Sequence, residues 1–419
     1  MSKIQRIKGV ADLFEPESAA YTYMEETARR VFSRYGYEEV RIPVIEKTEL
    51  FARSIGEETD VVQKEMYTFD DRKGRSITMR PEATAGVLRA YIDNKAMQSA
   101  SGVTKLFTFG PMFRYERPQK GRMRQFHQID AEVIGTDAPE ADAELLLMLR
   151  TFLNEIGLKA LIFEINSLGC RDCRPDYRQA LTDYFEGLGE AGLCEDCIRR
   201  SKTNPLRVLD CKVPACNEAV KNAPNVRDHL CGDCRTDYER AKELLDAAGA
   251  TYVENDRLVR GLDYYVGLTF EVTSHDIGAQ TAVAGGGRYD GLIRDLGGKD
   301  EPATGFAIGM ERLAMLLPEI KPRATDFYVA LLDDAGMDIA VKLSQELRER
   351  GLAGEMDFTS GSMKSRLRAA NKKNAAFCLL IGKDEIESGN VTIKDLATGE
   401  QWSADFEHAA DTLIERLEK

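Results

Sequence analysis

The chain has 419 residues and a formal net charge of −13, which argues against a histone-like protein that coats nucleic acid with bulk positive charge. Hydrophobic residues make up 43% and charged residues 30%, as in a globular protein of about two to four domains. There is no apolar stretch of roughly 18 residues, and the amino terminus lacks the apolar region of a secretory signal. We therefore expect a cytoplasmic protein without a membrane partner.

Helical and strand patterns alternate over the first part of the chain. Apolar side chains recur at helical spacing up to Gly36, which suits a helix end, and the next segment alternates like a half-buried strand with Pro43 better suited to an edge. A long antiparallel pair follows, joined by a charged loop that contains Pro118 and Gly121. The predicted elements are a helix over 15–35, a strand over 37–46, a hairpin over 67–82, paired strands over 105–116 and 124–135, and a helix over 140–156.

The charged loop gathers positive charge in an acidic chain, because five of the eleven residues from Arg114 to Arg124 are basic and only Glu116 is acidic. Arg114 and Glu116 are two apart on a predicted strand and so face the same side. A guanidinium there suits a phosphate oxygen, and a carboxylate suits the amine of adenine. The basic residues of the loop would reach a polyphosphate or a nucleic-acid backbone, with a solvated hairpin loop as the alternative. These loop residues are Arg117, Lys120, Arg122 and Arg124.

Strand character returns over 258–274, after a segment of different composition. Arg260 lies beside this predicted strand and is followed by Tyr264 and Tyr265. The two tyrosines suit a small polar pocket, and ordinary half-buried sheet aromatics are the alternative.

Two glycine-containing segments complete the predicted sheet. The run over 285–292 has three glycines in succession at a predicted strand-to-loop junction, which allows close backbone approach to a ligand, with a plain bulge or turn as the favoured alternative. An apolar strand over 305–313 leads through Gly309 into a helix that carries Arg312 in its first turn. An arginine at that end disfavours the helix itself, so we expect it to serve an anionic ligand.

Eight of the nine cysteines lie in the segment of different composition, which we interpret as a mostly helical insertion over 169–250. They form four close pairs, three with CxxC spacing, enough for two tetrahedral zinc sites with thiolate ligands. Reduced buried thiols are the alternative, and the sequence leaves open how the pairs combine. His229 is a further candidate ligand, and Cys378 is expected to be a core thiol. The eight cysteines are Cys170, Cys173, Cys194, Cys197, Cys211, Cys216, Cys231 and Cys234.

The last part of the chain, over 325–419, alternates strand with helix, which is typical of a compact α/β domain. Basic residues follow one another along a predicted helix over 361–372 and the loop after it. They suit a phosphate backbone, and a solvated helix face is the alternative. These residues are Lys364, Arg366, Arg368, Lys372 and Lys373.

The order of these segments closely resembles the histidyl-tRNA synthetases, a family of class II aminoacyl-tRNA synthetases. The resemblance rests on GYEEVRIPVIE, FTFGPMFRYERPQKGRMRQFHQIDAE, RGLDYY, AGGGRYDGL and ATGFAIGMERL, and it spans essentially the whole chain. It implies an α+β fold, in which helices flank a class II antiparallel sheet, with an inserted, mostly helical Cys-rich module and a C-terminal α/β anticodon-binding domain. The implied domains are a catalytic domain over 1–168 and 251–321, an insertion over 169–250, and an anticodon-binding domain over 325–419.

The resemblance also implies roles for individual residues. The catalytic residues would be Arg114, Gln128 and Arg260, with Arg260 as the fixed cation at the reacting α-phosphate. Histidine would be bound by Glu82, Thr84, Arg114, Gln128, Glu132, Arg260, Tyr264 and Tyr265, among which Glu132 and the tyrosines would read the imidazole. ATP would be bound by Arg114, Glu116, Arg122, Phe126 and Arg312. The acceptor end of tRNA would be met by Arg117, Gln119, Lys120 and Arg124.

Members of this family are ligases that join L-histidine to tRNA(His) through a histidyl-adenylate, with ATP as substrate and Mg²⁺ on the outgoing pyrophosphate. The resemblance implies a homodimer with the first motif at its interface. Zinc is not part of the shared chemistry, because many members lack these cysteines. One rival is the regulatory subunit of ATP phosphoribosyltransferase, which usually lacks the anticodon domain and the arginines. Another is a zinc-dependent RNA-binding protein, which leaves the histidine-type motifs unexplained.

Overall fold

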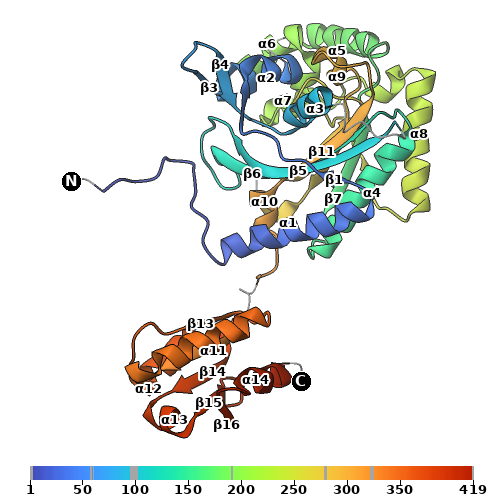
Figure 1. Ribbon diagram of the computed structural model, residues 1–419. Helices are drawn as coiled ribbons and strands as arrows, with labels where there is room; N and C mark the ends of the chain where they lie inside the picture. Colours follow the sequence, from blue (N-terminus) through green and yellow to red (C-terminus); the bar gives the residue numbers. More distant parts are fainter. Residues whose placement is uncertain are drawn as a thin grey trace. The chain divides into compact units, whose positions relative to one another are not determined.

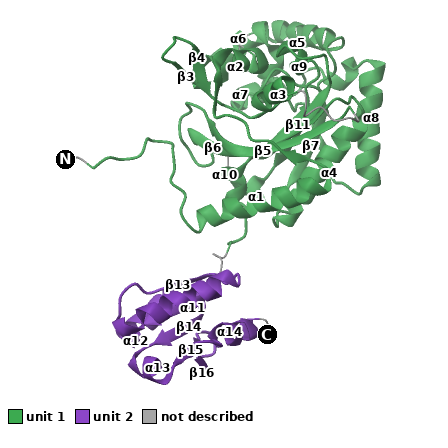
Figure 2. Ribbon diagram, in the orientation of Figure 1, with its two compact units in different colours: residues 1–320 green, residues 321–419 purple. Residues whose placement is uncertain are grey.

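The structure, a computed structural model, describes residues 3–56, 59, 61–94, 102–189, 192–277, 281–320 and 325–417. The chain forms two compact units, residues 1–320 and 321–419 (Figure 2), and each is described by itself. Within these described ranges, no helix combines the length and apolar character needed to cross a membrane.

Unit 1 is built on an eight-stranded sheet of order β1-β5-β6-β11-β10-β9-β7-β8 (Figure 1). The six central strands are antiparallel, which confirms the predicted sheet, whereas the short edge strands β1 and β8 run parallel to their neighbours. The strands are β1 Glu38–Glu39, β5 Thr104–Phe113, β6 Gln125–Ile134, β7 Ile162–Ser167, β8 Val253–Glu254, β9 Val266–Thr273, β10 Ala282–Arg288 and β11 Ala303–Gly309.

Different helices cover the two faces of this sheet. One face packs against α1, α4, α8 and α10 in a core that includes Phe32, Phe107 and Phe306. The other face packs against α3 and α9 in a smaller core that includes Leu106 and Tyr289. The neighbours Leu106 and Phe107 enter different cores because successive strand residues point to opposite faces. The helices are α1 Glu17–Arg34, α3 Thr84–Asp93, α4 Pro139–Glu155, α8 Gly232–Ala247, α9 Leu292–Asp295 and α10 Met310–Ala314.

The predicted strand over 37–46 is wrong as a single element. It is two short strands, β1 in the large sheet and β2 in a separate sheet of order β2-β4-β3. Pro43 lies between them, where its missing N–H and fixed φ suit a break in the ladder. The elements of this region are β2 Ile45–Lys47, α2 Thr48–Ile55, η1 Val61–Glu65, β3 Tyr67–Asp70 and β4 Ser76–Met79.

The predicted strand over 258–274 is wrong in its first half. Strand β9 begins only at Val266, and residues 258–265 form an irregular segment before it, here called the Arg260 loop. Gly261 and Asp263 are both poor strand formers, which accounts for the later start. The tyrosine pair is therefore held by a loop and not by a strand ladder.

Between β7 and β8 the chain forms a mostly helical, cysteine-rich segment, as predicted. Its small core combines thiol side chains with Tyr177, Leu181 and Phe185. The helices before α8 are α5 Arg174–Leu188, α6 Glu195–Thr203, η3 Pro205–Val208, α7 Pro214–Ala219 and η4 Val226–His229.

Unit 2 is an α/β unit on a five-stranded sheet of order β13-β12-β14-β15-β16. Strands β12, β13 and β14 are parallel, and β15 and β16 continue the sheet antiparallel. Phe327 and Val329 pack with α11 and α14, whereas Tyr328 packs with α12 on the other face. The elements are β12 Thr325–Leu331, η6 Asp334–Gly336, α11 Met337–Glu349, β13 Gly354–Met356, α12 Met363–Lys372, β14 Ala375–Ile381, α13 Lys383–Ser388, β15 Asn390–Asp395, β16 Gln401–Asp405 and α14 Ala409–Leu417.

Candidate active site

Strand β6 supplies a row of side chains to one face of the large sheet. Phe126, Gln128, Asp130 and Glu132 alternate with apolar residues that enter the main core, because the side-chain period of a strand is two. Gln128 is 8% exposed, Asp130 1% and Glu132 0%. Buried carboxylates raise the free energy of a fold unless they are paired, so this row indicates a functional site.

A cleft with a cavity volume of about 250 Å³ lies on this face. Its walls come from β6 and the loop before it, the Arg260 loop, β10, and the beginnings of α3 and α10. It is lined by every residue predicted to bind histidine or ATP except Glu132, which is fully buried. These lining residues are Glu82, Thr84, Arg114, Glu116, Arg122, Phe126, Gln128, Arg260, Tyr264, Tyr265 and Arg312.

Arginines give the cleft a positive wall. Arg114 Nε donates to the carbonyl oxygen of Pro81 at 2.9 Å, and its guanidinium lies 5.2 Å from the centre of the Phe126 ring. Arg312 donates to the carbonyl oxygen of Gly121 in the basic loop at 3.1 Å and to that of Ala282 at the start of β10 at 2.6 Å. Burial, and after it the nearby Arg122, lowers the pKa of the Arg312 guanidinium. An anion bound between these cations would offset both effects.

Arg122 and Glu116 are paired with each other in this structure. Arg122 Nε lies 2.6 Å from Glu116 Oε2. Both residues are predicted to contact ATP, so bound ATP would replace this ion pair with its own contacts to Arg122 and Glu116.

Tyr264 and Tyr265 line one part of the cleft, and a buried pair, Glu132 and Tyr289, lies next to them. The Tyr289 hydroxyl donates to Glu132. The rings of Tyr264 and Tyr265 are 4.6 Å apart, and Tyr264 lies 5.7 Å from Tyr289. Burial raises the pKa of Glu132 to about 8, against the opposing effect of the Tyr289 hydroxyl. A carboxyl group that titrates near neutrality fits an imidazole, which exchanges protons in the same range.

Arg260 reaches the cleft across a strand of glycines. Its Nη1 donates to Glu271 Oε1 at 2.7 Å, and its guanidinium lies 5.5 Å from the centre of the Tyr265 ring. A Cβ at Gly285 would come within 2.4 Å of the guanidinium nitrogens. The glycines 285–287, predicted at a strand end, lie inside β10, which pairs with β9 and β11. Gly285 thus allows close approach of the guanidinium, and a register shift between Gly287 and Arg288 fits the predicted bulge, whereas the predicted turn is wrong.

Several buried polar atoms of the site have no hydrogen-bond partner among the described residues. They are Gln128 Oε1, Glu132 Oε1, Arg260 Nε and both carboxyl oxygens of Asp130. Glu82, by contrast, accepts from the Ala85 N–H at 3.0 Å at the start of α3. Buried polar groups are nearly always paired in folded proteins, so the unpaired set is available to a polar ligand.

The basic loop between β5 and β6 carries the residues predicted to meet tRNA. Arg117, Gln119 and Lys120 are exposed. Arg124 is half-buried, and its guanidinium lies 4.1 Å from the centre of the Tyr115 ring. Arg124 therefore supports the loop, whereas the other three face solvent.

The basic run predicted on unit 2 is not one continuous surface. Arg366 Nη1 lies 2.8 Å from the buried Asp357 carboxylate, and Lys373 Nζ lies 2.8 Å from Glu355. These two cations have structural partners, which spacing along a helix could not show. The exposed members of the run that form neither of these pairs are Lys364, Arg368 and Lys372.

The sequence did not single out four residues that build the site. Tyr289 and Glu271 contact predicted residues, and Tyr289 lies in the glycine-rich segment that was noted. Arg80 is 3% exposed and donates to backbone carbonyl oxygens at 2.9 Å, which ties neighbouring segments together. Glu311 accepts from the His127 N–H at 2.9 Å and so fixes the start of α10 to β6.

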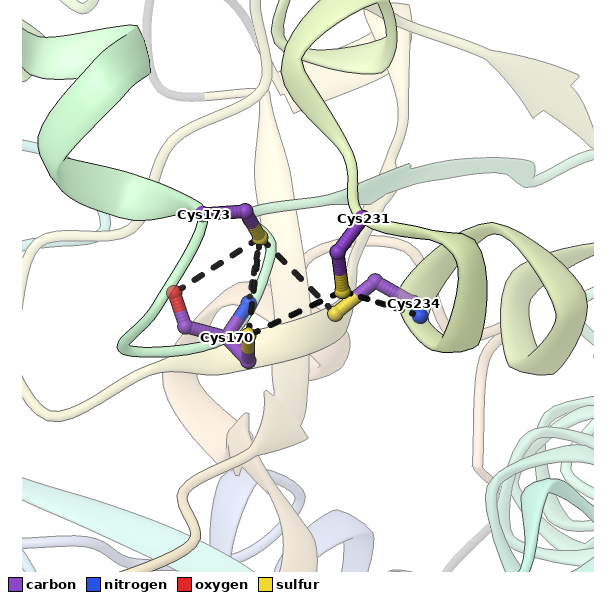
Figure 3. A group of neighbouring side chains, drawn as sticks. All are labelled: Cys170, Cys173, Cys231 and Cys234. Carbon is purple, nitrogen blue, oxygen red and sulfur yellow. Dashed lines mark hydrogen bonds between the residues drawn. The ribbon is translucent and has the colours of Figure 1, made fainter.

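The eight cysteines of the insertion form two clusters of four, each able to hold a metal ion. Within each cluster the sulfur atoms all lie within 4.8 Å of one another. His229 belongs to neither cluster, and its ring packs 5.5 Å from Tyr177, so its candidacy as a ligand is wrong. Cys378 is a buried core thiol of unit 2, as expected. The outer cluster is Cys170, Cys173, Cys231 and Cys234 (Figure 3), and the inner cluster is Cys194, Cys197, Cys211 and Cys216.

Comparison with known proteins agrees with this geometry. A family model described as Histidyl-tRNA synthetase matches residues 9–313, and one described as Anticodon binding domain matches residues 326–416. A histidine–tRNA ligase of Maridesulfovibrio salexigens is 63% identical over 401 residues, which are 95% of this chain and 97% of that protein. The crystal structure of apo S. aureus histidyl-tRNA synthetase has a TM-score of 0.81 at 34% identity and covers 99% of this chain and 100% of its own. An ATP phosphoribosyltransferase regulatory subunit/histidyl-tRNA synthetase from Bacillus halodurans is similar in fold alone, with a TM-score of 0.66 at 19% identity over 88% of this chain and 97% of that one. The chain belongs to the histidyl-tRNA synthetase family.

Proposed function

We infer that the protein is a histidine–tRNA ligase, which activates L-histidine with ATP to histidyl-adenylate and then transfers histidine to the 3′ end of tRNA(His). The observation that carries this function is one cleft lined by arginines and two tyrosines, next to which lies the buried pair of Glu132 and Tyr289. A regulatory subunit does not account for Arg114, Arg260 and Arg312 in a single cleft. An RNA-binding protein without catalysis does not account for the cleft at all.

Arg114 and Arg260 are the groups we assign to the reacting α-phosphate. The histidine carboxylate attacks the α-phosphorus, an acyl–phosphate bond forms, and the bond to pyrophosphate breaks, so negative charge spreads over phosphate oxygens. Guanidinium groups already fixed in place stabilise that charge without reorganising. Phe126 would stack on adenine and Glu116 would accept from its amine, and Arg122 and Arg312 would hold the polyphosphate.

The part of the cleft next to Glu132 selects histidine. Glu132, Tyr264 and Tyr265 would read the imidazole, and Tyr289 joins them because it donates to Glu132. An apolar amino acid of similar size would leave the buried carboxyl group unpaired, which is a strong basis for rejection. The α-amino group would be held by Glu82, Thr84 and Gln128, and Gln128 offers an unpaired Oε1.

The second step joins the acyl group to tRNA. The terminal ribose hydroxyl attacks the acyl carbon of the adenylate, and AMP leaves. The loop residues Arg117, Gln119, Lys120 and Arg124 are assigned to the acceptor end, through the phosphate backbone. Residues 325–419 would bind the anticodon, and residues 169–250 would be an insertion in a catalytic domain over 1–168 and 251–321.

Two kinds of metal ion fit this chain. Glu271 offers the cleft a carboxylate oxygen of the kind that Mg²⁺ prefers, and Mg²⁺ bound with ATP would neutralise charge on the outgoing pyrophosphate. The two cysteine clusters fit structural zinc, because all-thiolate sets of four are typical of zinc sites.

A homodimer is the assembly we propose, with the first motif at its interface. Val44 and Ile45 of this motif are 37% and 50% exposed, and Phe69 of the same small sheet is 47% exposed. Exposed apolar side chains on and next to one small sheet favour an interface. Sedimentation of the wild-type protein and of Ile45→Asp would test the assembly, since the variant should shift toward the monomer.

Amino-acid-dependent ATP–pyrophosphate exchange, run with each standard amino acid, tests the function directly. Exchange with histidine alone is the expected result. Exchange with another amino acid would mean that Glu132 and the tyrosines do not select the imidazole of histidine. Absence of exchange with every amino acid would contradict the ligase assignment.

A further inference from the structure

Each cysteine cluster has the dimensions of a tetrahedral thiolate site. With Zn–S bonds of about 2.3 Å, sulfur ligands at tetrahedral positions lie about 3.8 Å apart. In the outer cluster Cys170 Sγ lies 3.6 Å from Cys173 Sγ and 3.9 Å from Cys231 Sγ, and Cys173 Sγ lies 3.9 Å from Cys234 Sγ (Figure 3). One sulfur pair of the inner cluster is also 3.9 Å apart. The nesting of the four pairs, which spacing left open, is thus first with fourth and second with third.

Backbone N–H groups point at the sulfur atoms in both clusters. In the outer cluster the Cys170 N–H donates to Cys173 Sγ at 3.1 Å. In the inner cluster the Cys194 N–H donates to Cys216 Sγ at 3.1 Å. Such hydrogen bonds stabilise thiolate charge and orient metal ligands, so the surroundings suit a bound cation as well as the sulfurs do.

The outer cluster lies beside a contact to the substrate pocket. Arg174 is the first residue of α5 and directly follows Cys173, and its guanidinium donates to the carbonyl oxygen of Tyr265. Just before the cluster, Gly169 accepts from the Gly267 N–H at 2.9 Å. The segment that carries the first two ligands is therefore bound to Tyr265 and to the start of β9 directly after it.

The inner cluster is linked to the same loop from another side. Arg207 lies in η3, four residues before Cys211. Its Nη2 donates to the Gly261 carbonyl oxygen at 2.6 Å, and its Nε donates to Asp263 Oδ1 at 3.2 Å. The Arg260 loop has no ladder of its own, so contacts such as these set its geometry.

We propose that zinc ions in the two clusters hold the insertion against the Arg260 loop and thereby set the affinity of the active site for histidine. This inference rests on the proposed function, because the loop matters through Arg260 and Tyr265. The insertion has only a small core built partly from thiol side chains, and small modules of this kind depend on a metal or disulfide for stability. Loss of zinc would therefore loosen Arg174 and Arg207 together with the helices that carry them.

The test begins with zinc content, measured by mass spectrometry on the purified full-length protein supplied with Zn²⁺, where two ions per chain are expected. Cys170→Ser with Cys231→Ser should remove one ion, and Cys194→Ser with Cys211→Ser should remove the other. Cys378→Ser, the same change outside both clusters, should keep two. In ATP–pyrophosphate exchange each zinc-deficient variant should raise the KM for histidine about tenfold and the KM for ATP much less.

A second variant keeps the test valid if loss of zinc unfolds the insertion. Arg207→Ala should retain two zinc ions and still raise the KM for histidine about fivefold. Arg199→Ala is the matched control, because Arg199 pairs with Asp196 of its own helix, at 3.4 Å. An unchanged KM for histidine in Arg207→Ala and in the zinc-deficient variants would overturn the link to the loop. A wild-type protein that binds no zinc would overturn the metal sites.

The wild-type protein separates failure of the function from failure of this inference. Two zinc ions per chain without histidine-dependent exchange would contradict the proposed function, and with it any role of zinc in histidine binding. Histidine-dependent exchange in a protein that binds no zinc would contradict the inference alone.

Discussion

Unit 1 and unit 2 each bury a carboxyl group, with opposite surroundings. In unit 2, Asp357 is 5% exposed and accepts from the Tyr328 hydroxyl at 2.6 Å and from Arg366 Nη1 at 2.8 Å. In unit 1, Glu132 is fully buried and accepts from the Tyr289 hydroxyl, and its Oε1 has no hydrogen-bond partner among the described residues. A buried unpaired group destabilises a fold by roughly 1–3 kcal/mol. The fully hydrogen-bonded Asp357 thus indicates a structural role, and the partly unpaired Glu132 indicates a ligand-binding role.

The largest expected effect follows from Arg260, the cation with an unpaired Nε in the cleft. Arg260→Ala should lower the rate of histidine-dependent exchange by roughly a thousandfold, because a fixed donor to developing charge is typically worth 10²–10³. Arg257→Ala is the matched control, since Arg257 lies just before the loop but donates to Lys221 of the insertion. Equal losses in the two variants would show that Arg260 acts on folding and not on the phosphate.

Glu132→Gln should lower kcat/KM for histidine by roughly a hundredfold, since a site built around a buried hydrogen bond loses a few kcal/mol when the partner changes. The KM for ATP should change little. Glu164→Gln on β7, a more distant strand of the same sheet, changes the same group outside the cleft and should leave both values unaltered. A uniform fall for histidine and ATP would contradict the assignment of Glu132 to the imidazole.

The raised pKa of Glu132 also predicts how the stability of the ligand-free protein depends on pH. Its pKa is raised by burial from an ordinary value of 4.5 to about 8, so the folded state holds a proton that the unfolded chain releases. The resulting stabilisation is complete below pH ~4.5 and is lost as the pH rises toward ~8. Compared with Glu132→Gln, wild-type unit 1 should therefore melt at progressively lower temperature between pH 5 and pH 8. A difference in melting temperature that does not change with pH would contradict the raised pKa.

The family resemblance made most of the site residues predictable from the sequence, and strand alternation accounts for only a part of them. Arg114 and Glu116 both line the cleft, but the prediction that they share a strand face is wrong, because β5 ends at Phe113 and both residues lie beyond it. Gln128 and Glu132, which the resemblance implied, do lie on one face of β6, as the period of two requires. Alternation is a local property, so it could place these side chains without knowledge of the sheet order. A local pattern can also be wrong: the strand predicted over 258–274 begins only at Val266, and residues 258–265 form a loop.

What the sequence could not provide depends on pairing between distant segments. Tyr289 is 157 residues from Glu132 and meets it only because β10 pairs with β11 and β11 with β6. Gly285 makes room for a guanidinium from another segment, which a run of glycines alone cannot reveal. In unit 2 the partner of Arg366 is a strand-end carboxylate, so counting cations along the helix overstated the free positive surface.

The satisfied carboxylate of unit 2 should behave in the opposite way to Glu132. Asp357→Asn leaves the half-buried Arg366 without its counter-charge and should lower the free energy of unfolding of unit 2 by about 2–3 kcal/mol. Histidine-dependent exchange, which needs only the cleft of unit 1, should be unchanged in the folded variant. Thermal unfolding together with exchange at a lower temperature measures both. A loss of exchange without a loss of stability would contradict the purely structural role assigned to Asp357.

The smallest effect is expected on the surface of unit 2, at Phe358, whose side chain is 83% exposed just before the helix that carries Lys364 and Arg368. An exposed aromatic ring near solvent-facing cations suits an unstacked base, and such stacking contributes about 1–3 kcal/mol. Phe358→Ala should therefore lower kcat/KM for tRNA in aminoacylation by roughly five- to tenfold, while exchange, which proceeds without tRNA, stays the same. Val341→Ala, at another half-exposed apolar position of unit 2, should change neither rate. If both variants lowered aminoacylation equally, the effect would belong to the stability of unit 2. If Phe358→Ala alone lowered aminoacylation, unit 2 would contact nucleic acid through an exposed aromatic ring. Such a contact lies on the surface and not in a pocket, so it requires no buried unpaired polar group in the protein.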